Sequence, residues 1–494
     1  MTVTLNAIGD LDLDAVRRVA LDGEGVRFGP AARQRIAKAH KDFQAYVEAN
    51  RGKFIYGVTS AYGPDAKKHT APEEQKKKMQ SGNPFIGLSF GQGHLPEHTV
   101  RAMVLATLSM VVEGTTAAHP DRAAAIAAML DGPMPEVPTQ GLVGAGEILA
   151  LFHLFSHMPR FPGYQAGTGN GTPATTGMGA ISAVFARRRL DLATRLFALS
   201  VEALDAPLEA YDPALKGLWG DPYEARALDR LNAVLKGART KGRRFYQAPV
   251  SWRILPRVLG QGERAVATLE AAALDSLHSM AANPTYVPAG WRGRKDGGKT
   301  LSTGAYHNAN VPPALNGMMA TWVDLALLAH RHTTKLHKGE VSLLPDRLLP
   351  PGTDVASGRS TTYFEYVPNG FIEEMRHLAQ PVLLSPLEPA ASEQDDIAAP
   401  GPVAHIMEQR VAALFDMTMA VLAATASQAL HVTKRAPAPP LQPLLKEIRR
   451  HFAPVVDTRK LGPEGERLAA AFGAAVRDGH FGAVRLDSQA ARAR

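Results

Sequence analysis

The chain has 494 residues, of which 21% are charged and 45% are hydrophobic, a composition typical of a soluble globular protein with ample buried surface. It contains no cysteine, which excludes disulfide bonds, thiolate metal sites and a cysteine nucleophile. The formal net charge is +8, and basic clusters such as 236–244 fall in Gly-rich loops. We interpret these clusters as solvated loops rather than as a nucleic-acid interface, with steering of an anionic substrate as a third interpretation.

The amino terminus lacks the basic segment followed by an apolar run that marks a signal peptide. No apolar run approaches the roughly 18 residues that are needed to span a bilayer. We therefore predict a soluble, cytoplasmic protein without a membrane partner.

Apolar residues at helical spacing dominate the chain, and strand-like patterns are few. The helices predicted from this periodicity cover 12–21, a segment opened by Gly29 and Pro30, 96–113, 120–130, 178–206, 222–238, 256–280, 314–335, 371–378 and 403–432. Residues 54–64 form a strand-like run that breaks into a Gly-rich loop. This pattern predicts a mainly α protein with a bundle of long helices, whose polar loops carry any active site.

We predict two domains. The first, 1–205, carries the polar loops, and the second, 206–494, holds the central long-helix bundle and the C-terminal region.

The segment 137–153 reads VPTQGLVGAGEILALFH. It resembles the Gly-Ser-Val-Gly-Ala-Ser-Gly-Asp-Leu-Ala-Pro-Leu pattern of the aromatic amino acid ammonia-lyases, the histidine, phenylalanine and tyrosine enzymes. In that family the Ala-Ser-Gly triplet cyclises and loses two waters to form the electrophile methylidene-imidazolone (MIO). Here the triplet is Gly144, Ala145 and Gly146, one residue shorter and without a hydroxyl that could leave. We therefore predict that MIO is absent from this position and that no other cofactor or metal is bound.

Two loops resemble further parts of the family's active site. The run from Tyr56 to Gly63 is similar to Tyr-Gly-Val-Asn-Thr-Gly-Phe-Gly, which implies that Tyr56 is the catalytic base. A phenol suits that role only where its surroundings lower its pKa. Residues 168–176 resemble the family segment whose asparagine holds the electrophile and the substrate amine. Asn170 takes that place, where it either caps a helix or binds the substrate directly.

Two segments further along the chain continue the resemblance. Residues 246–260 resemble Gln-Asp-Pro-Tyr-Ser-Leu-Arg-Cys-Gln-Pro-Gln-Val-Met-Gly, which implies that Arg253 binds a substrate carboxylate through its planar guanidinium and that Gln247 donates to the substrate. The family tyrosine in this segment is Val250. In 302–307 the aromatic position is Tyr306, which the resemblance places among the catalytic residues, while Ala305 replaces the family asparagine.

Three more residues are candidates for substrate binding. Residues 392–397 resemble the Asn-Gln-Asp segment of the phenylalanine and tyrosine enzymes, and Gln394 stands at its glutamine. The substrate-selecting segment aligns ambiguously near Leu88 and Phe90, whose apolar side chains would suit an aromatic or acyl group.

The resemblance runs from about residue 11 to about residue 430. It implies the long-helix bundle of the aspartase, fumarase and ammonia-lyase type, and a homotetramer in which each site is built from three subunits. The functional hypothesis is a lyase-type elimination, or the reverse addition, on a carboxylate-bearing small molecule, with Tyr56 as base and Arg253 as anchor. One alternative is an inactive homologue that binds a small molecule or assembles with a partner. A working ammonia-lyase with an unusual electrophile is a third hypothesis, and its mass would be about two waters below the sequence value.

Overall fold

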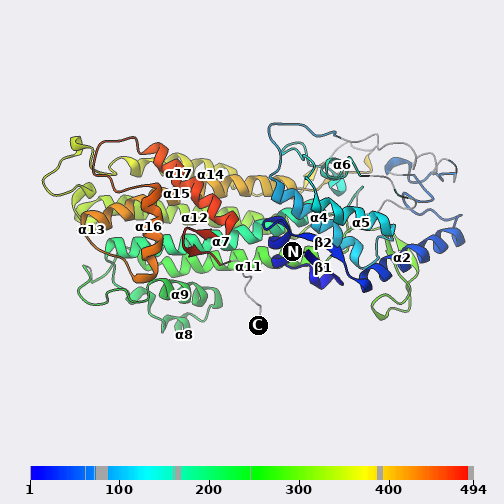
Figure 1. The fold of residues 1–494 in the computed structure, drawn as a ribbon, viewed down its shortest axis with the longest axis horizontal. Coiled ribbons are helices and arrows are strands. Elements are labelled where there is room, and N and C mark those ends of the chain that lie inside the picture. The colour runs from blue at the N-terminus through cyan, green and yellow to red at the C-terminus, as the bar shows by residue number, and fades with distance from the viewer. Residues whose placement is uncertain are drawn as a thin grey trace. The chain divides into compact units, whose positions relative to one another are not determined.

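The computed structural model describes residues 2–61, 63–71, 73, 87–158, 161, 169–244, 246–386 and 393–487 (Figure 1). Helices make up most of the described chain, which confirms the predicted mainly α fold. The helices are α1 (Leu13–Ala20), α2 (Pro30–Ala49), α4 (Glu97–Val112), α5 (Pro120–Ala128), α6 (Ile148–Leu154), α7 (Pro173–Leu204), α8 (Leu215–Trp219), α9 (Pro222–Val234), α10 (Val250–Arg253), α11 (Leu255–Leu277), α12 (Val311–His337), α13 (Gly339–Ser342), α14 (Val367–Leu378), α15 (Gly401–Val432), α16 (Gln442–His451) and α17 (Gly462–Asp478).

The strands form short two-stranded sheets. They are β1 (Thr2–Leu5) with β2 (Gly25–Phe28), β3 (Thr285–Val287) with β4 (Lys299–Leu301), β5 (Ser385–Pro386) with β6 (Ile397–Ala398), and β7 (His480–Phe481) with β8 (Val484–Arg485). The first pair is parallel, with Thr2 opposite Gly25, and the other three are antiparallel.

The chain divides into two compact units, each assembled from three segments. Unit 1 comprises Met1–Val184, Leu269–Leu315 and Pro381–Ile406, and unit 2 comprises Phe185–Thr268, Asn316–Gln380 and Met407–Arg494. The division therefore falls within the long helices α7, α11, α12 and α15. The predicted domain boundary after residue 205 instead follows the end of α7.

Unit 1 is organised around α4, whose residues from Thr99 to Val112 are all buried. The first half of α7 approaches α4 so closely that Gly177 is needed there. A β-carbon at this position would lie 2.5 Å from the backbone nitrogen of Met103. Because no real β-carbon tolerates such a contact, a larger residue would push the two helices apart.

Unit 2 contains the remaining lengths of α7, α11, α12 and α15, which run side by side (Figure 1). Buried polar pairs join them: Arg187 with Glu263 between α7 and α11 (2.5 Å), Arg189 with Asp416 between α7 and α15 (2.9 Å), and Trp322 with Glu408 between α12 and α15 (3.0 Å). A buried charge is tolerated when it is paired and hydrogen-bonded, so the arginine run that the sequence shows in the middle of α7 is part of the interior.

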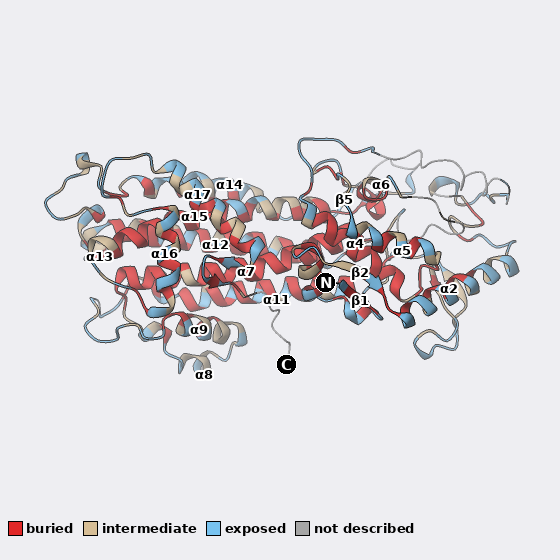
Figure 2. Cartoon of the chain, in the orientation of Figure 1, coloured by how far each residue is buried: buried red, intermediate tan, exposed pale blue. Residues whose placement is uncertain are grey.

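One sequence expectation is wrong. The described residues of 54–64 form turns rather than a strand, and among them Ser60 makes an isolated bridge with His69. The Thr59 hydroxyl accepts the N–H of Ile55 at 2.8 Å, and this local bond closes the turn. The helix α15 is long and apolar enough to pass the length test for a membrane span. Of its most apolar stretch, 89% is buried inside the protein, so it is a core helix (Figure 2).

Candidate functional site

The triplet at 144–146 begins a short turn, Ala145–Glu147, which leads directly into α6. Gly144 is extended, whereas Gly146 and Glu147 have φ values of 60° and 57° in the left-handed region. The Gly144 carbonyl accepts the N–H of Ala399 at 3.1 Å, and the Gly146 carbonyl accepts the N–H of Gly171 at 3.0 Å. These two bonds fix the triplet between the short connection from β6 to α15 and the loop that precedes α7.

Asn170 and Tyr306 lie against the triplet. A β-carbon built on Gly146 would lie 3.0 Å from Cβ of Asn170 and 3.5 Å from Cδ2 of Tyr306. The Asn170 amide oxygen accepts the backbone N–H of Asn283 at 3.4 Å, which ties this loop to the chain before β3. The structure therefore brings together the triplet and two of the residues that the sequence singled out.

Tyr56 is half-buried, and its hydroxyl accepts the N–H of Gly63 at 3.1 Å. Burial raises the pKa of this phenol above its ordinary value, an effect that the Gly63 N–H opposes and the negative charge of Asp395 strengthens. A tyrosine that acts as a base needs a lowered pKa, and the described surroundings of Tyr56 shift its pKa in the opposite direction. Asp395, which the sequence analysis missed, is the acidic neighbour.

Glu147 is the second residue that the sequence analysis missed. Its side chain is fully buried and accepts the N–H groups of Ala174 at 2.8 Å and Thr175 at 3.1 Å, in the first turn of α7. Burial raises the pKa of this carboxyl to about 7, against the lowering effect of those donors. One signal was available, because Glu147 is the only charged residue in the apolar stretch 137–152.

The remaining candidates of unit 1 face outward. Leu88 is 49% exposed and Phe90 is 87% exposed, and Gln394 is also exposed. Ser89, between the first two, is held by its hydroxyl on the Gly141 carbonyl at 2.8 Å and by its N–H on Nε2 of His153 at 3.0 Å. The side chains proposed to line a substrate pocket are therefore uncovered in the single chain.

Arg253 and Gln247 belong to unit 2, where they line a cavity of about 180 Å³ together with Tyr211 and Tyr246. The Arg253 Nε donates to the carbonyl of Ala248 at 2.9 Å. Within the described part of the chain its guanidinium has no carboxylate partner, so its terminal nitrogens remain available for an anion.

The backbone beside Arg253 is firmly fixed. The carbonyl of Trp252 accepts the hydroxyl of Tyr211 at 2.8 Å, and the Trp252 ring stacks on His332 with centroids 3.8 Å apart. Burial lowers the pKa of His332 to about 3, so this ring is neutral and serves packing. Across the described residues, no group of three or more His, Asp or Glu side chains is placed to hold a metal ion.

A model of the family described as aromatic amino acid lyase matches residues 11–159 and 166–450. The chain belongs to the aromatic amino acid lyase family. Among its relatives, the histidine ammonia-lyase of Symbiobacterium thermophilum is 27% identical over 493 residues, covering 93% of this chain and 94% of the relative. The histidine ammonia-lyase of Anaeromyxobacter dehalogenans is 25% identical and covers 87% of this chain and 90% of the relative.

Solved structures share the fold of this family member. Ergothionase from Treponema denticola superposes with a TM-score of 0.82 at 16% identity, covering 96% of this chain and 99% of that one. Tyrosine aminomutase from Streptomyces globisporus gives a TM-score of 0.80 at 19% identity, covering 98% and 100%. The predicted long-helix fold of the ammonia-lyase type is thereby confirmed.

Proposed function

We propose that this family member is an MIO-independent, lyase-type enzyme. It would catalyse elimination, or the reverse addition, on a carboxylate-bearing small molecule, aromatic substrates among them. The observation that carries the proposal is that the triplet has no hydroxyl, while Asn170 and Tyr306 still lie against it and Tyr56 is retained.

The residues of the triplet do not fit the MIO group. Gly144, Ala145 and Gly146 offer only hydrogen atoms and a methyl group, so nothing can leave as water to create an exocyclic double bond. Space is also short, because a β-carbon on Gly146 would already crowd Asn170 at 3.0 Å. No catalytic step is therefore assigned to MIO.

Elimination without that electrophile needs a substrate whose proton is acidified by a neighbouring carbonyl group. A base removes the proton, the electron pair becomes the new double bond, and the leaving group departs from the next carbon. Hydrogen-bond donors stabilise the enolate that develops between these events. In this proposal Tyr56 accepts the proton and Arg253 holds the carboxylate. Asn170, Gln247 and Gln394 supply polar donors.

Arg253 and Gln247 are assigned to unit 2, whereas the triplet cluster belongs to unit 1. The family resemblance implies a homotetramer with composite sites, and we propose that neighbouring copies supply Arg253 and Gln247 to each triplet cluster. The exposed side chains of Leu88 and Phe90 support this assembly, since an apolar substrate pocket requires that they be covered. The assembled enzyme is proposed to be cytoplasmic.

One observation favours a second candidate function, a catalytically inactive homologue that binds a small molecule or a partner. The pKa of Tyr56 is raised by burial and by Asp395, which disfavours the phenolate that a base requires. A cation from a neighbouring copy or from the substrate would have to reverse this shift in an active enzyme.

The test begins with the purified full chain and a panel of L-histidine, L-tyrosine, L-phenylalanine and their deaminated or hydroxylated acids. We expect an intact mass equal to the sequence value, and turnover of at least one acid. Tyr56→Phe should lower kcat about a hundredfold to ten-thousandfold, with the rate of the unmodified enzyme rising toward alkaline pH because the phenol must ionise. Tyr366→Phe, at a tyrosine that is 61% exposed, is the matched control.

Three outcomes separate the hypotheses. A mass about two waters below the sequence value would overturn MIO independence. Saturable binding of an acid without turnover would select the inactive homologue. Equal activity of Tyr56→Phe and the unmodified enzyme would remove Tyr56 from the mechanism while leaving the lyase assignment in place.

A further inference from the structure

A second cavity, larger than the one beside Arg253, lies within unit 2 at the carboxyl end of α7. Its volume is about 490 Å³, within the range of small-molecule sites. Three segments that are distant in sequence line it: the end of α7, the loop 237–243 and the chain 435–442. None of the residues in the proposed catalytic site lines this space, which we name the arginine cavity.

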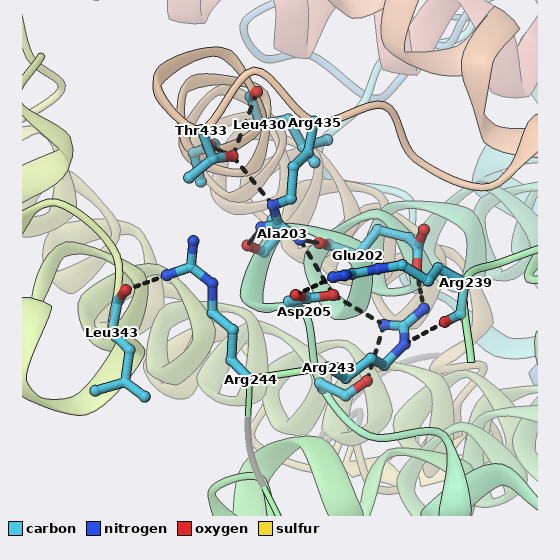
Figure 3. Close-up of polar contacts among 12 residues, drawn as sticks. Glu202, Ala203, Asp205, Arg239, Arg243, Arg244, Leu343, Leu430, Thr433 and Arg435 are labelled. Carbon is cyan, nitrogen blue, oxygen red and sulfur yellow. Dashed lines mark hydrogen bonds and ion pairs between the residues drawn. The ribbon is translucent and has the colours of Figure 1, made fainter. Parts of the chain in front are cut away.

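Three guanidinium groups converge on one carboxylate at the wall of the arginine cavity (Figure 3). Asp205 lies 2.5 Å from Nη2 of Arg239, 3.3 Å from Nη1 of Arg435 and 3.9 Å from Nη1 of Arg243. Glu202 adds a second carboxylate, 2.5 Å from Nη2 of Arg243. Positive groups therefore outnumber the carboxylates that line the cavity.

Two of these arginines, Arg243 and Arg239, differ in how fully their donors are used. The Arg243 side chain is only 4% exposed, and its nitrogens are bonded to Glu202 and to the carbonyls of Ala206 and Arg239. Arg239 is 55% exposed, and it donates to Asp205 through a single nitrogen, Nη2. Among the described residues its other nitrogens have no hydrogen-bond acceptor, and Asp205 would keep two guanidinium neighbours if Arg239 turned to a ligand.

The sequence around the cavity increases this positive excess. Segments 236–244 and 434–442 together carry seven basic residues and no acidic residue. Burial lowers the pKa of Arg435, and the positive charges of Arg244 and Arg239 act in the same direction, against the effect of Asp205. A site in which cations repel one another gains from a bound anion.

We propose that the arginine cavity binds a phosphorylated small molecule, with its phosphate held by the guanidinium of Arg239 and attracted by the positive charge of Arg435. A planar guanidinium offers two parallel N–H groups that match two phosphate oxygens, and arginine is preferred over lysine wherever such paired recognition is needed. The cavity has room for more than a single phosphate group. This assignment also explains the basic cluster at 236–244, which the catalytic proposal leaves without a role.

Isothermal titration calorimetry of the full chain tests the proposal by measuring the binding of inorganic phosphate, pyrophosphate and ATP. Sodium chloride at matched ionic strength and citrate serve as controls for screening and for carboxylates. We expect pyrophosphate and ATP to bind saturably and citrate to bind at least tenfold more weakly. Arg239→Gln should weaken pyrophosphate binding by about tenfold to a hundredfold, the effect of losing a charged hydrogen-bond donor.

The matched control is Arg376→Gln, which removes a 59% exposed arginine from α14 and should leave pyrophosphate binding unchanged. Arg239→Lys keeps the charge but loses the planar fork, so it should also weaken binding. Absence of binding at matched ionic strength, equal binding of citrate, or unchanged affinity in Arg239→Gln would each overturn the proposal. A change of oligomeric state in Arg239→Gln, without loss of a phosphate-binding signal, would show that a second copy of the chain occupies the cavity instead.

Discussion

The two ends of α7 are capped by side chains of opposite charge. At the amino end, N–H groups of the first turn donate to the buried carboxyl of Glu147. At the carboxyl end, the carbonyls of Glu202 and Ala203 accept from the guanidinium of Arg435 at 2.9 and 2.6 Å. Both arrangements satisfy backbone groups that have no partner inside a helix, and both place charge where the helix dipole favours it.

The difference lies in what surrounds each charge. Glu147 is fully buried, and this burial raises its pKa to about 7 against the lowering effect of the neutral donors that contact it. Arg435 is 21% exposed and shares carboxylates with two other arginines beside an open cavity. The isolated carboxyl of Glu147 can therefore lose its charge by binding a proton. The paired arginines and carboxylates stay ionised, and the cavity beside them has room for a ligand.

A substitution at the carboxyl end of α7 is expected to have the largest effect on stability. Arg435→Met should lower the free energy of unfolding by about 2–4 kcal/mol, because two buried carbonyls lose a charged donor and Asp205 loses one of its cations. Urea denaturation followed by circular dichroism measures the loss. Arg331→Met, at an exposed position of α12, should change stability little. Equal losses in the two variants would contradict the capping role.

The amino end should respond to pH in a defined direction. The folded protein holds the Glu147 proton more tightly than the unfolded chain does, so stability is lost as pH rises from the ordinary value of 4.5 through about 7. Glu147→Gln keeps an acceptor for the α7 N–H groups and removes the titration. We expect this variant to gain about 2 kcal/mol relative to the unmodified protein between pH 5.5 and 8.

Comparing the two proteins at each pH cancels the contributions of the histidines, which are common to both. Glu466→Gln, at an exposed glutamate of α17, is the control and should show no such gain. A constant difference between Glu147→Gln and the unmodified protein across this pH range would mean that Glu147 is ionised throughout.

A smaller effect is expected from Thr433, whose hydroxyl accepts Nε of Arg435 at 3.2 Å. Thr433→Val removes this acceptor while keeping the shape of the side chain, and should cost about 0.5–1.5 kcal/mol. The same urea experiment measures it. In the double variant, the loss in the free energy of unfolding should be smaller than the sum of the two single losses. The reason is that Arg435→Met removes the donor that Thr433→Val leaves unpaired. Full additivity would show that Thr433 acts on stability independently of Arg435.

Much of the fold could be predicted because helical periodicity is local. The predicted helices 96–113 and 403–432 match α4 and α15 within two residues at each end, since unbroken apolar faces and nearby Pro or Gly define them. The run at 54–64 was assigned wrongly because side-chain bonds of Thr59 turn the chain in a way that composition does not reveal.

The candidate site likewise has features that follow from the sequence and features that depend on the fold. That Gly144, Ala145 and Gly146 lack a hydroxyl is a property of the sequence alone, because covalent chemistry depends on which atoms are present. The contact of Asn170 and Tyr306 with the triplet, the burial of Glu147 and the raised pKa of Tyr56 were decided by tertiary structure. Each depends on groups far apart in the chain meeting in a medium of low dielectric constant, where desolvation outweighs the ordinary preference of a side chain.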